Sequence, residues 1–322
     1  MKLTRFARYT WLVVAVNLFV IVWGAYVRAS FSGDGCGSHW PLCNGEVIPT
    51  TGLLKTLIEL THRLTSGVAL LLVAGMVWQT KCFPRGHRVR RGAFWSLVFI
   101  LIEALIGAAL VKFELVAGNA SVARAFVMSI HLVNTFLLIA ALSLTAWWAM
   151  GGERVRLRGQ GKVSLLFALA LSGTILIAVS GAIAALGDTL FPASSLAQGI
   201  KQDFSAAAHF LVRLRVLHPL LAVGIGCYAV AAASYVNTFQ RPGERTKRLT
   251  NILTTLFLVQ LGAGILNVSL LAPIWLQLTH LLLADLFWIA LVLTAASALA
   301  QTDATAETLE QINLHAATET GN

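Results

Sequence analysis

Charged residues are scarce in this sequence, and those present are clustered. Asp, Glu, Lys and Arg make up only 12% of the 322 residues, whereas 57% are hydrophobic. A soluble domain carries about 25% charged residues, so the scarcity excludes an ordinary soluble globular protein. Stretches without any charge recur along the chain, at 11–27, 64–80, 125–150, 163–187, 216–240 and 249–284.

These stretches are long enough to cross a bilayer, which takes about 20 apolar residues. Residues 92–111 add a span with a single charge, Glu103, and 249–284 hold two spans separated by a turn at Pro273. Segment 11–27 is too long for a signal-peptide core and lacks a small-residue cleavage site after it, so we expect a retained first span. The predicted fold class is an all-α membrane protein with eight transmembrane helices.

Negatively charged residues are scarcer than positively charged ones, with 14 Asp and Glu against 24 Lys and Arg. The net charge of +10 does not indicate nucleic-acid binding, because sixteen basic residues flank the first span or follow spans two, four and six. Short basic loops remain cytoplasmic. Both termini are therefore predicted on the cytoplasmic side of a bacterial inner membrane, with a disordered polar tail at 301–322.

Short motifs recur in the same order in the two halves of the chain, at offsets of 149 to 157 residues. The pairs are Trp23-Gly24-Ala25 with Ser180-Gly181-Ala182, His62 with His218, Ile106-Gly107-Ala108 with Leu261-Gly262-Ala263, and His131 with His280. Because each half has an even number of spans, both lie the same way up in the membrane. We predict two pseudo-symmetric four-helix bundles, residues 1–150 and 151–300.

Histidines occur on every even-numbered span: His62, His131, His218 and His280. Each is placed one to two turns from the outer end of its span, so the four share one depth. Haem iron commonly takes axial histidine, and bundle cofactors are held between facing helices. A single membrane histidine often serves helix–helix hydrogen bonding instead, but four at one depth favour two bis-histidine haem sites.

Cysteines are also few, four in all. Cys36 and Cys43 lie in the first outer loop, which is predicted to face an oxidising compartment where disulfides persist. Cys82 lies at the inner end of span two and Cys227 within span six, so neither is a plausible partner. The residues alone favour a structural disulfide between Cys36 and Cys43, with a redox-active pair as the alternative.

A carboxylate precedes the first membrane histidine in the Glu-x-x-His-Arg motif of residues 59–63. Positions i and i+3 share a helix face, so Glu59 lies one turn above His62. It is either a supporting or interfacial charge or a carboxylate that acts on a substrate beside the iron. Arg63 is expected to pair with haem propionates or to anchor the span at the interface, and the same alternatives apply to Arg213 and Arg215.

The loop of residues 36–49, with Trp-Pro-Leu-Cys-Asn-Gly at 40–45, the motif at 59–63 and the eight-span plan resemble the haem A synthase family. The resemblance covers nearly all of residues 10–300. It implies an oxidoreductase that converts haem O to haem A by oxidising a ring methyl to a formyl group through successive hydroxylations, for use in terminal oxidases. Implied partners are haem O, a haem O synthase and a membrane electron donor, and a homo-oligomer is left open.

The resemblance also assigns roles to individual residues. His62 and His131 flank the amino-half site for the substrate haem, and His218 and His280 ligate a haem b cofactor in the carboxy half. Glu59 matches the family's catalytic carboxylate.

Cys36 and Cys43 match the family's loop pair, which favours a redox or catalytic role for their disulfide. Some members carry a second cysteine pair in the third outer loop, but residues 187–210 contain none. A thiol relay between the two loops is therefore in doubt.

Three other functions compete with haem oxidation. A di-haem b-type electron-transfer cytochrome would share the histidine pairs but leave the haem unmodified. A parallel-repeat transporter would be colourless and does not explain four histidines at one depth. A quinone-linked thiol oxidase needs a second reactive cysteine pair.

Overall fold

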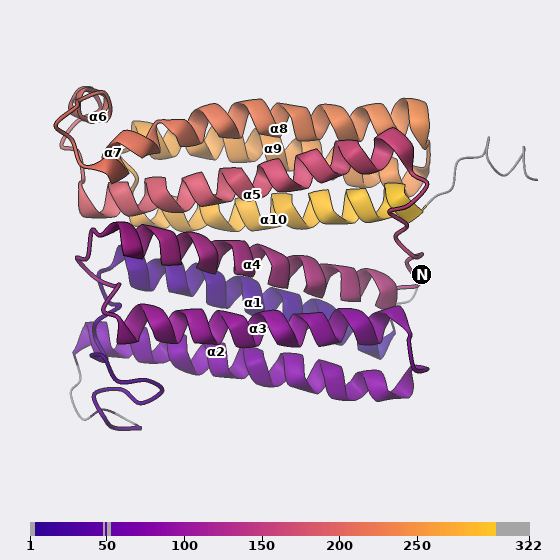
Figure 1. Ribbon diagram of the computed structural model, residues 1–322, viewed down its shortest axis with the longest axis horizontal. Helices are drawn as coiled ribbons and strands as arrows, with labels where there is room; N and C mark the ends of the chain where they lie inside the picture. The colour runs from indigo at the N-terminus through magenta and orange to yellow at the C-terminus, as the bar shows by residue number, and fades with distance from the viewer. Residues whose placement is uncertain (1–3, 48, 50–52, 301–322) are drawn as a thin grey trace, which may run out of the picture.

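The computed structural model describes residues 4–47, 49 and 53–300, and almost all of this chain is helical (Figure 1). The part described contains no strand. The helices are α1 Arg5–Ala29, α2 Leu54–Gln79, α3 Arg88–Lys112, α4 Val122–Ala149, α5 Gly161–Leu190, α6 Leu196–Asp203, α7 Phe210–Arg215, α8 Leu217–Tyr235, α9 Glu244–Ser269 and α10 Ile274–Ala300.

Eight helical segments are long and apolar enough to cross a membrane, which confirms the predicted all-α fold class and span number. Span two is α2 extended by a 3-10 turn, Thr80–Cys82, and span six runs from α7 through α8 into a π-helical turn, Val236–Gln240. The short α6 is an additional helix in the third outer connection. The tail at 301–322 lies outside the described residues.

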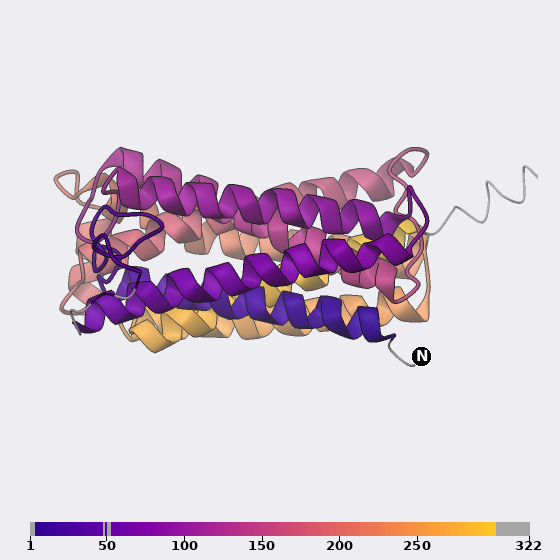
Figure 2. The ribbon, with the colours of Figure 1, turned by 90° about the horizontal axis from the view of Figure 1, so that it is seen from below.

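The membrane-spanning helices form two sets that are stacked in Figure 1 and overlap when seen from below in Figure 2. In the first set α1 packs on α2, α2 on α3, α3 on α4 and α4 on α1. The second set repeats this order with α5, α8, α9 and α10. The same neighbour order is what a duplicated bundle requires, while the pseudo-symmetry and the boundary at residue 150 stay predictions.

Helices α1 and α4 of the first set contact α5 and α10 of the second. Nearly every residue of α10 beyond Asp285 is buried, which places this helix in the centre of the molecule. The indole N–H of Trp288 donates to the carbonyl of Phe136 at 2.7 Å, and their rings lie 5.0 Å apart. A buried indole needs such a partner, so this contact fixes α10 against α4.

Arg28 at the end of α1 also joins the two sets. Its guanidinium donates to the Ala185 carbonyl at 2.7 Å and to the Thr189 hydroxyl at 2.5 Å, both on α5. A third bond, of 2.9 Å, reaches the side-chain oxygen of Gln277 on α10. Since lipid offers no hydrogen bonds, these three acceptors provide the hydrogen-bond partners that the guanidinium between the bundles requires.

Span six is interrupted at Val216, between α7 and α8. Pro219 cannot donate a backbone bond to the carbonyl four residues earlier, that of Arg215, and its ring disfavours helix there. The helix is therefore broken one turn before Pro219, close to His218. The predicted turn at Pro273 is confirmed, because α9 ends at Ser269 and α10 begins at Ile274.

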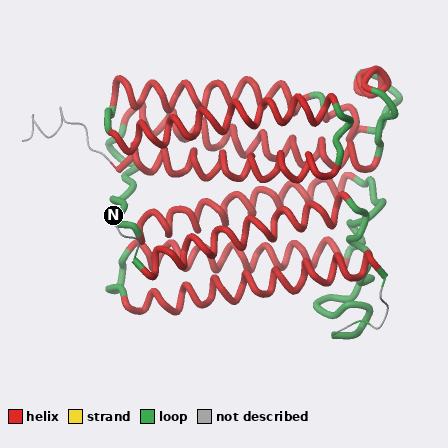
Figure 3. The backbone as a smooth tube through the Cα atoms, turned by 180° about the vertical axis from the view of Figure 1, so that it is seen from behind, coloured by secondary structure: helices red, strands yellow, loops and turns green. Residues whose placement is uncertain are grey.

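Connections cluster at the two ends of the bundle (Figure 3). We call the outer end the one that carries residues 30–47, 113–121, 191–209 and 270–273. The amino terminus of α1 and the end of α10 lie together at the opposite, inner end (Figure 1). The basic connections lie at this inner end, as the topology prediction requires.

The topology can be tested by thiol labelling, because the exposed Cys82 lies at the inner end. In a Cys227→Ser background, a membrane-impermeant maleimide should label Cys82 in inverted vesicles but not in intact cells. Adding Lys201→Cys, on the exposed surface of α6, should introduce labelling of intact cells. Labelling of Cys82 from outside intact cells would reverse the predicted orientation.

Candidate functional site

The carboxy half brings two of the predicted histidines face to face. His218 on α8 and His280 on α10 have ring centres 6.3 Å apart, with the planes nearly perpendicular at 86°. Metal–imidazole bonds are about 2 Å long and the ring centre lies about 1 Å further on, so two imidazoles sharing one metal have centres roughly 6 Å apart. The observed separation matches this value.

The amino half holds the other two, His62 on α2 and His131 on α4, and these helices are opposite each other in the neighbour order of the first set. The four histidines lie six to nine residues from the outer starts of their spans, or about 9–14 Å at 1.5 Å per residue. Counted along the helices, the four histidines therefore lie about two turns from the outer starts of their spans, and their common role stays a prediction.

Glycines on neighbouring helices let three of these imidazoles approach the backbone closely. A Cβ atom added to Gly24 of α1 would lie 2.9 Å from Cε1 of His62, and one on Gly181 of α5 would lie 3.0 Å from Cε1 of His218. On Gly264 of α9 it would lie 3.2 Å from Cε1 of the imidazole that α10 contributes. Any side chain at these positions would push the imidazole away.

Several buried imidazole nitrogens have no hydrogen-bond partner among the residues that the structure describes. This holds for Nδ1 of His62, His131 and His280. Nδ1 of His218 lies 3.1 Å from the Ser180 hydroxyl, and Nε2 of His280 lies 3.2 Å from the Gln260 side-chain nitrogen. Buried polar atoms almost always have partners, so the unpaired nitrogens indicate a site that accepts a further group.

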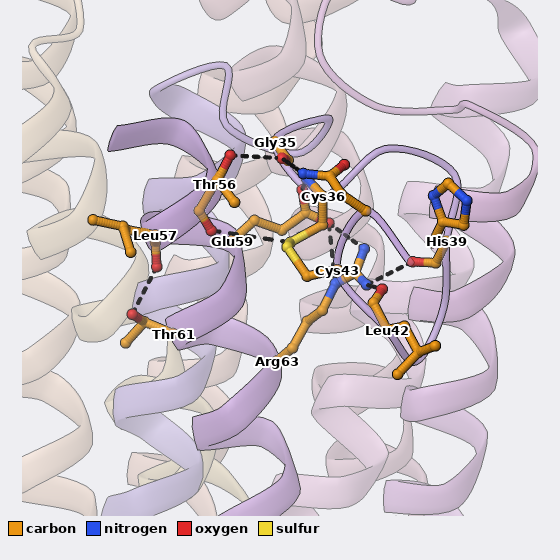
Figure 4. Close-up of a disulfide and its surroundings, with 11 residues drawn as sticks. Gly35, Cys36, His39, Leu42, Cys43, Thr56, Leu57, Glu59, Thr61 and Arg63 are labelled. Carbon is orange, nitrogen blue, oxygen red and sulfur yellow. Dashed lines mark hydrogen bonds and ion pairs between the residues drawn. A yellow bond between two sulfur atoms is a disulfide. The ribbon is translucent and has the colours of Figure 1, made fainter. Parts of the chain in front are cut away.

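Glu59 is 3% exposed and ties the first outer loop to α2 (Figure 4). Its Oε2 accepts the Cys36 backbone N–H at 2.8 Å, and its Oε1 accepts two bonds from the Arg63 guanidinium, at 2.5 and 3.2 Å. Arg63 also donates to the carbonyls of His39 and Leu42, each at 2.6 Å. Contact of Arg63 with a cofactor stays a prediction, because here its donors hold the loop.

Cys36 and Cys43 form the predicted disulfide, and both are buried. Cys82 and Cys227 are free, as expected, and both are exposed. The Asn44 backbone N–H donates to the Cys36 carbonyl at 3.0 Å, which closes the loop alongside the disulfide. The covalent bridge therefore lies against the Glu59 carboxylate, one turn above His62 on α2.

The carboxy half has a different charge at the position that corresponds to Glu59. Arg215 precedes His218 by three residues, as Glu59 precedes His62. Its guanidinium binds the carboxylates of Asp188, at 3.1 Å, and Asp203. At the outer end, a carboxylate therefore lies near one histidine pair, and a cation bound by two carboxylates lies near the other. Arg213 is exposed.

Two acidic residues received no role from the sequence. Glu103 of α3 accepts bonds from the side chains of Asn134 and Thr135 on α4, and it lies 3.4 Å from Nδ1 of His131. Asp285 on α10 is fully buried, and neither of its carboxylate oxygens has a hydrogen-bond partner in the part of the chain that the structure describes. Glu103 was missed because its partners lie on a different helix.

Comparison with known proteins identifies relatives. Residues 7–53 and 52–292 match the COX15-CtaA family, described as cytochrome oxidase assembly protein. A protein from Thermus thermophilus named protoheme IX farnesyltransferase is 50% identical over 297 residues, which cover 92% of this chain and 49% of that protein.

Two further relatives are named heme A synthase. The one from Exiguobacterium sp. AT1b is 35% identical over 126 residues, covering 39% of this chain and 41% of that protein. The one from Bacillus mycoides KBAB4 is 40% identical over 109 residues, covering 33% and 35%. The chain spans about half the length, or less, of the curated relatives it matches.

Loop attachment can be tested with Arg63→Gln, which cannot bind Glu59 and both loop carbonyls together. Charge-assisted bonds contribute about 1.5–3 kcal/mol each, so losing them should expose the buried disulfide and speed its reduction by a water-soluble phosphine about tenfold or more. Mass spectrometry of alkylated protein measures the rate. Arg213→Gln, at the same end of the bundle, is the control, and equal rates in all three proteins would contradict the role of Arg63.

Proposed function

The chain belongs to the COX15-CtaA family of cytochrome oxidase assembly proteins, and from this premise we propose that it converts haem O to haem A. In this proposal the amino-half histidines hold haem O as substrate, and the carboxy-half histidines hold haem b as cofactor. The observation that carries it is the combination of two histidine pairs with a buried carboxylate, Glu59, beside only one of them.

The geometry of the carboxy-half pair supports haem ligation. The 6.3 Å between the ring centres of His218 and His280 suits two axial ligands on one iron. The unpaired Nδ1 atoms of His62 and His280 further support sites built for an additional group. These features fit a haem in each half, with imidazole as the axial ligand.

The charges at the outer mouth support the assignment of the two halves. A carboxylate beside a substrate can accept a proton or stabilise positive charge. Both functions would assist the oxidation of a ring methyl group. Glu59 offers such a group, and the corresponding Arg215 is a cation already paired with Asp188 and Asp203. We therefore assign the reaction to the amino half.

Bound haem iron would supply the redox chemistry, and the residues of this chain would supply position and charge. His62 and His131 would fix the haem between α2 and α4. Arg63 orients the Glu59 carboxylate by binding its Oε1, while the backbone N–H of Cys36 holds Oε2. The loop over these residues would limit the access of water.

The name of the Thermus relative suggests a neighbouring reaction. That protein is named a farnesyltransferase, and this chain matches about half of it. Haem O carries a farnesyl-derived chain, so a farnesyltransferase acting on protohaem makes the substrate proposed here. We accordingly propose a haem O synthase as a partner, together with an electron carrier in the membrane of a bacterial cell.

Pigment analysis tests the reaction. Purified protein from cells that supply haem O should contain haem A, whereas Glu59→Gln should form it about 10²–10⁴-fold more slowly while retaining bound haem. Glu114→Gln removes an exposed outer carboxylate and should match wild type. Unchanged haem A formation in Glu59→Gln would refute the role of Glu59. Conversion of protohaem and farnesyl diphosphate to haem O would instead indicate a farnesyltransferase.

Haem stoichiometry tests the ligands. Wild-type protein loaded in the cell should carry about two haems with bis-histidine spectra, and His131→Ala and His280→Ala should each lose about one. The spectrum that disappears should differ between the two variants. A colourless wild-type protein would favour the transporter alternative, and two unmodified haems without haem A formation would favour the electron-transfer cytochrome.

A further inference from the structure

Glu103 lies in a polar cluster that the proposed reaction does not use. Its Oε2 accepts the Asn134 side-chain amide at 2.5 Å, and its Oε1 accepts the Thr135 hydroxyl. Oε1 also lies 3.4 Å from Nδ1 of His131, slightly beyond an N–H···O hydrogen bond of about 2.9 Å. Asn134 and Thr135 are buried and lie within about one turn of His131 on α4.

The three side chains that contact this carboxylate, Asn134, Thr135 and His131, can each donate a hydrogen bond. The single hydroxyl proton of Thr135 is shared with the carbonyl of His131, 2.9 Å away. The Asn134 amide donates to the Phe99 carbonyl as well, at 2.9 Å, so its nitrogen is fixed toward α3. An ionised carboxylate accepts hydrogen bonds and cannot donate them, so the surroundings suit Glu103 as an acceptor. Within the described residues, the Nδ1 atom of His131 has no other partner.

In the second bundle, the position that corresponds to Glu103 holds an uncharged residue, Gln260. Gln260 follows Glu103 by 157 residues, the offset that also separates Gly24 from Gly181. Gln260 contacts His280 on the next span, with its side-chain nitrogen 3.2 Å from Nε2, whereas Glu103 lies against Nδ1 of the histidine on the span after its own.

The glycines do not decide this alignment. Gly107 and Gly264 each stand four residues after Glu103 and Gln260. A Cβ added to Gly264 would meet His280, whereas one added to Gly107 or Gly262 would meet no described atom within 4 Å. The comparison of Glu103 with Gln260 therefore rests on their common offset and on the contact that each makes with a histidine.

We propose that Glu103 is a positioning residue for His131, and that the Glu103–Gln260 difference makes the two haem sites electronically unequal. The carboxylate accepts a hydrogen bond from the Nδ1–H of His131, which orients the imidazole and leaves Nε2 for iron. His280 has a neutral amide instead. The inference rests on the proposed function, because it requires His131 and His280 to be iron ligands.

The physical consequence is a change in ligand strength. A carboxylate that accepts the second N–H of a ligating histidine fixes its tautomer and raises its basicity. Hydrogen bonds to axial ligands and nearby charge set the potential of a haem. The amino-half iron is thus stabilised in its oxidised form by a charge that the carboxy half lacks.

A purely structural role for Glu103 makes a different prediction. The cluster with Asn134 and Thr135 joins α3 to α4, so its loss would lower the thermal stability of the protein in either case. Only positioning of His131 couples the carboxylate to the reduction potential of one haem. The potential is therefore the decisive quantity.

The experiment compares wild type, Glu103→Gln and Gln260→Glu as haem-loaded protein in detergent, by optical redox titration. His131→Ala and His280→Ala assign each spectrum to its half. Glu103→Gln should raise the midpoint potential of the amino-half haem and weaken its retention about tenfold or more, leaving the carboxy-half haem unchanged. Gln260→Glu should lower the midpoint potential of the carboxy-half haem.

The carboxy-half haem reports folding of Glu103→Gln, and the reciprocal variant tests the inference from the other side. Unchanged potentials in both variants, with two bis-histidine haems present, would overturn the role of Glu103 alone. Wild-type protein without haem would overturn the proposed function as well. Equal shifts of both haems in Glu103→Gln would indicate a general structural effect and overturn the positioning role.

Discussion

Polar side chains between membrane helices must find partners from the protein, because the hydrocarbon core offers none. At the outer end of this molecule the rule is met by long-range contacts. Arg28 joins the two bundles, and Arg215 binds two carboxylates from neighbouring segments. Among the described residues, the imidazoles of His62, His131 and His280 each keep a buried nitrogen without a hydrogen-bond partner. These nitrogens belong to side chains at one depth, which is the level where a ligand is expected.

Both bundles place helices and histidines in the same order, yet they differ in charge at corresponding positions. Glu59 corresponds to Arg215 and Glu103 to Gln260. Each exchange removes a carboxylate from the carboxy half. A shared scaffold fixes where the histidines lie, and the function proposed for each half then depends on the side chains around them. Both differences place a carboxylate near the amino-half histidines at positions where the carboxy half has a cation or a neutral amide.

Much of this architecture could be predicted from the sequence, because hydropathy and loop charge act locally along the chain. The eight spans, the disulfide and the common depth of the histidines follow from such signals. Glu103 could not be assigned, since its partners lie on α4 and depend on how two helices are rotated against each other. The contacts of Arg63 could not be predicted either. Its acceptors are the backbone carbonyls of His39 and Leu42, and every residue has such a carbonyl.

The disulfide and the carboxylate form one structural unit, which bears on whether the cysteines are structural or reactive. Cys36 donates its backbone N–H to Glu59, Glu59 accepts from Arg63, and Arg63 returns to the carbonyl of Leu42 beside Cys43. Hydrogen bonds thus join both sides of the bridge to the same turn of α2. A change in the bond between the sulfurs would therefore alter the support of the carboxylate above His62. The structural and the reactive interpretations of the disulfide are therefore compatible, because the same hydrogen bonds hold the loop and position Glu59.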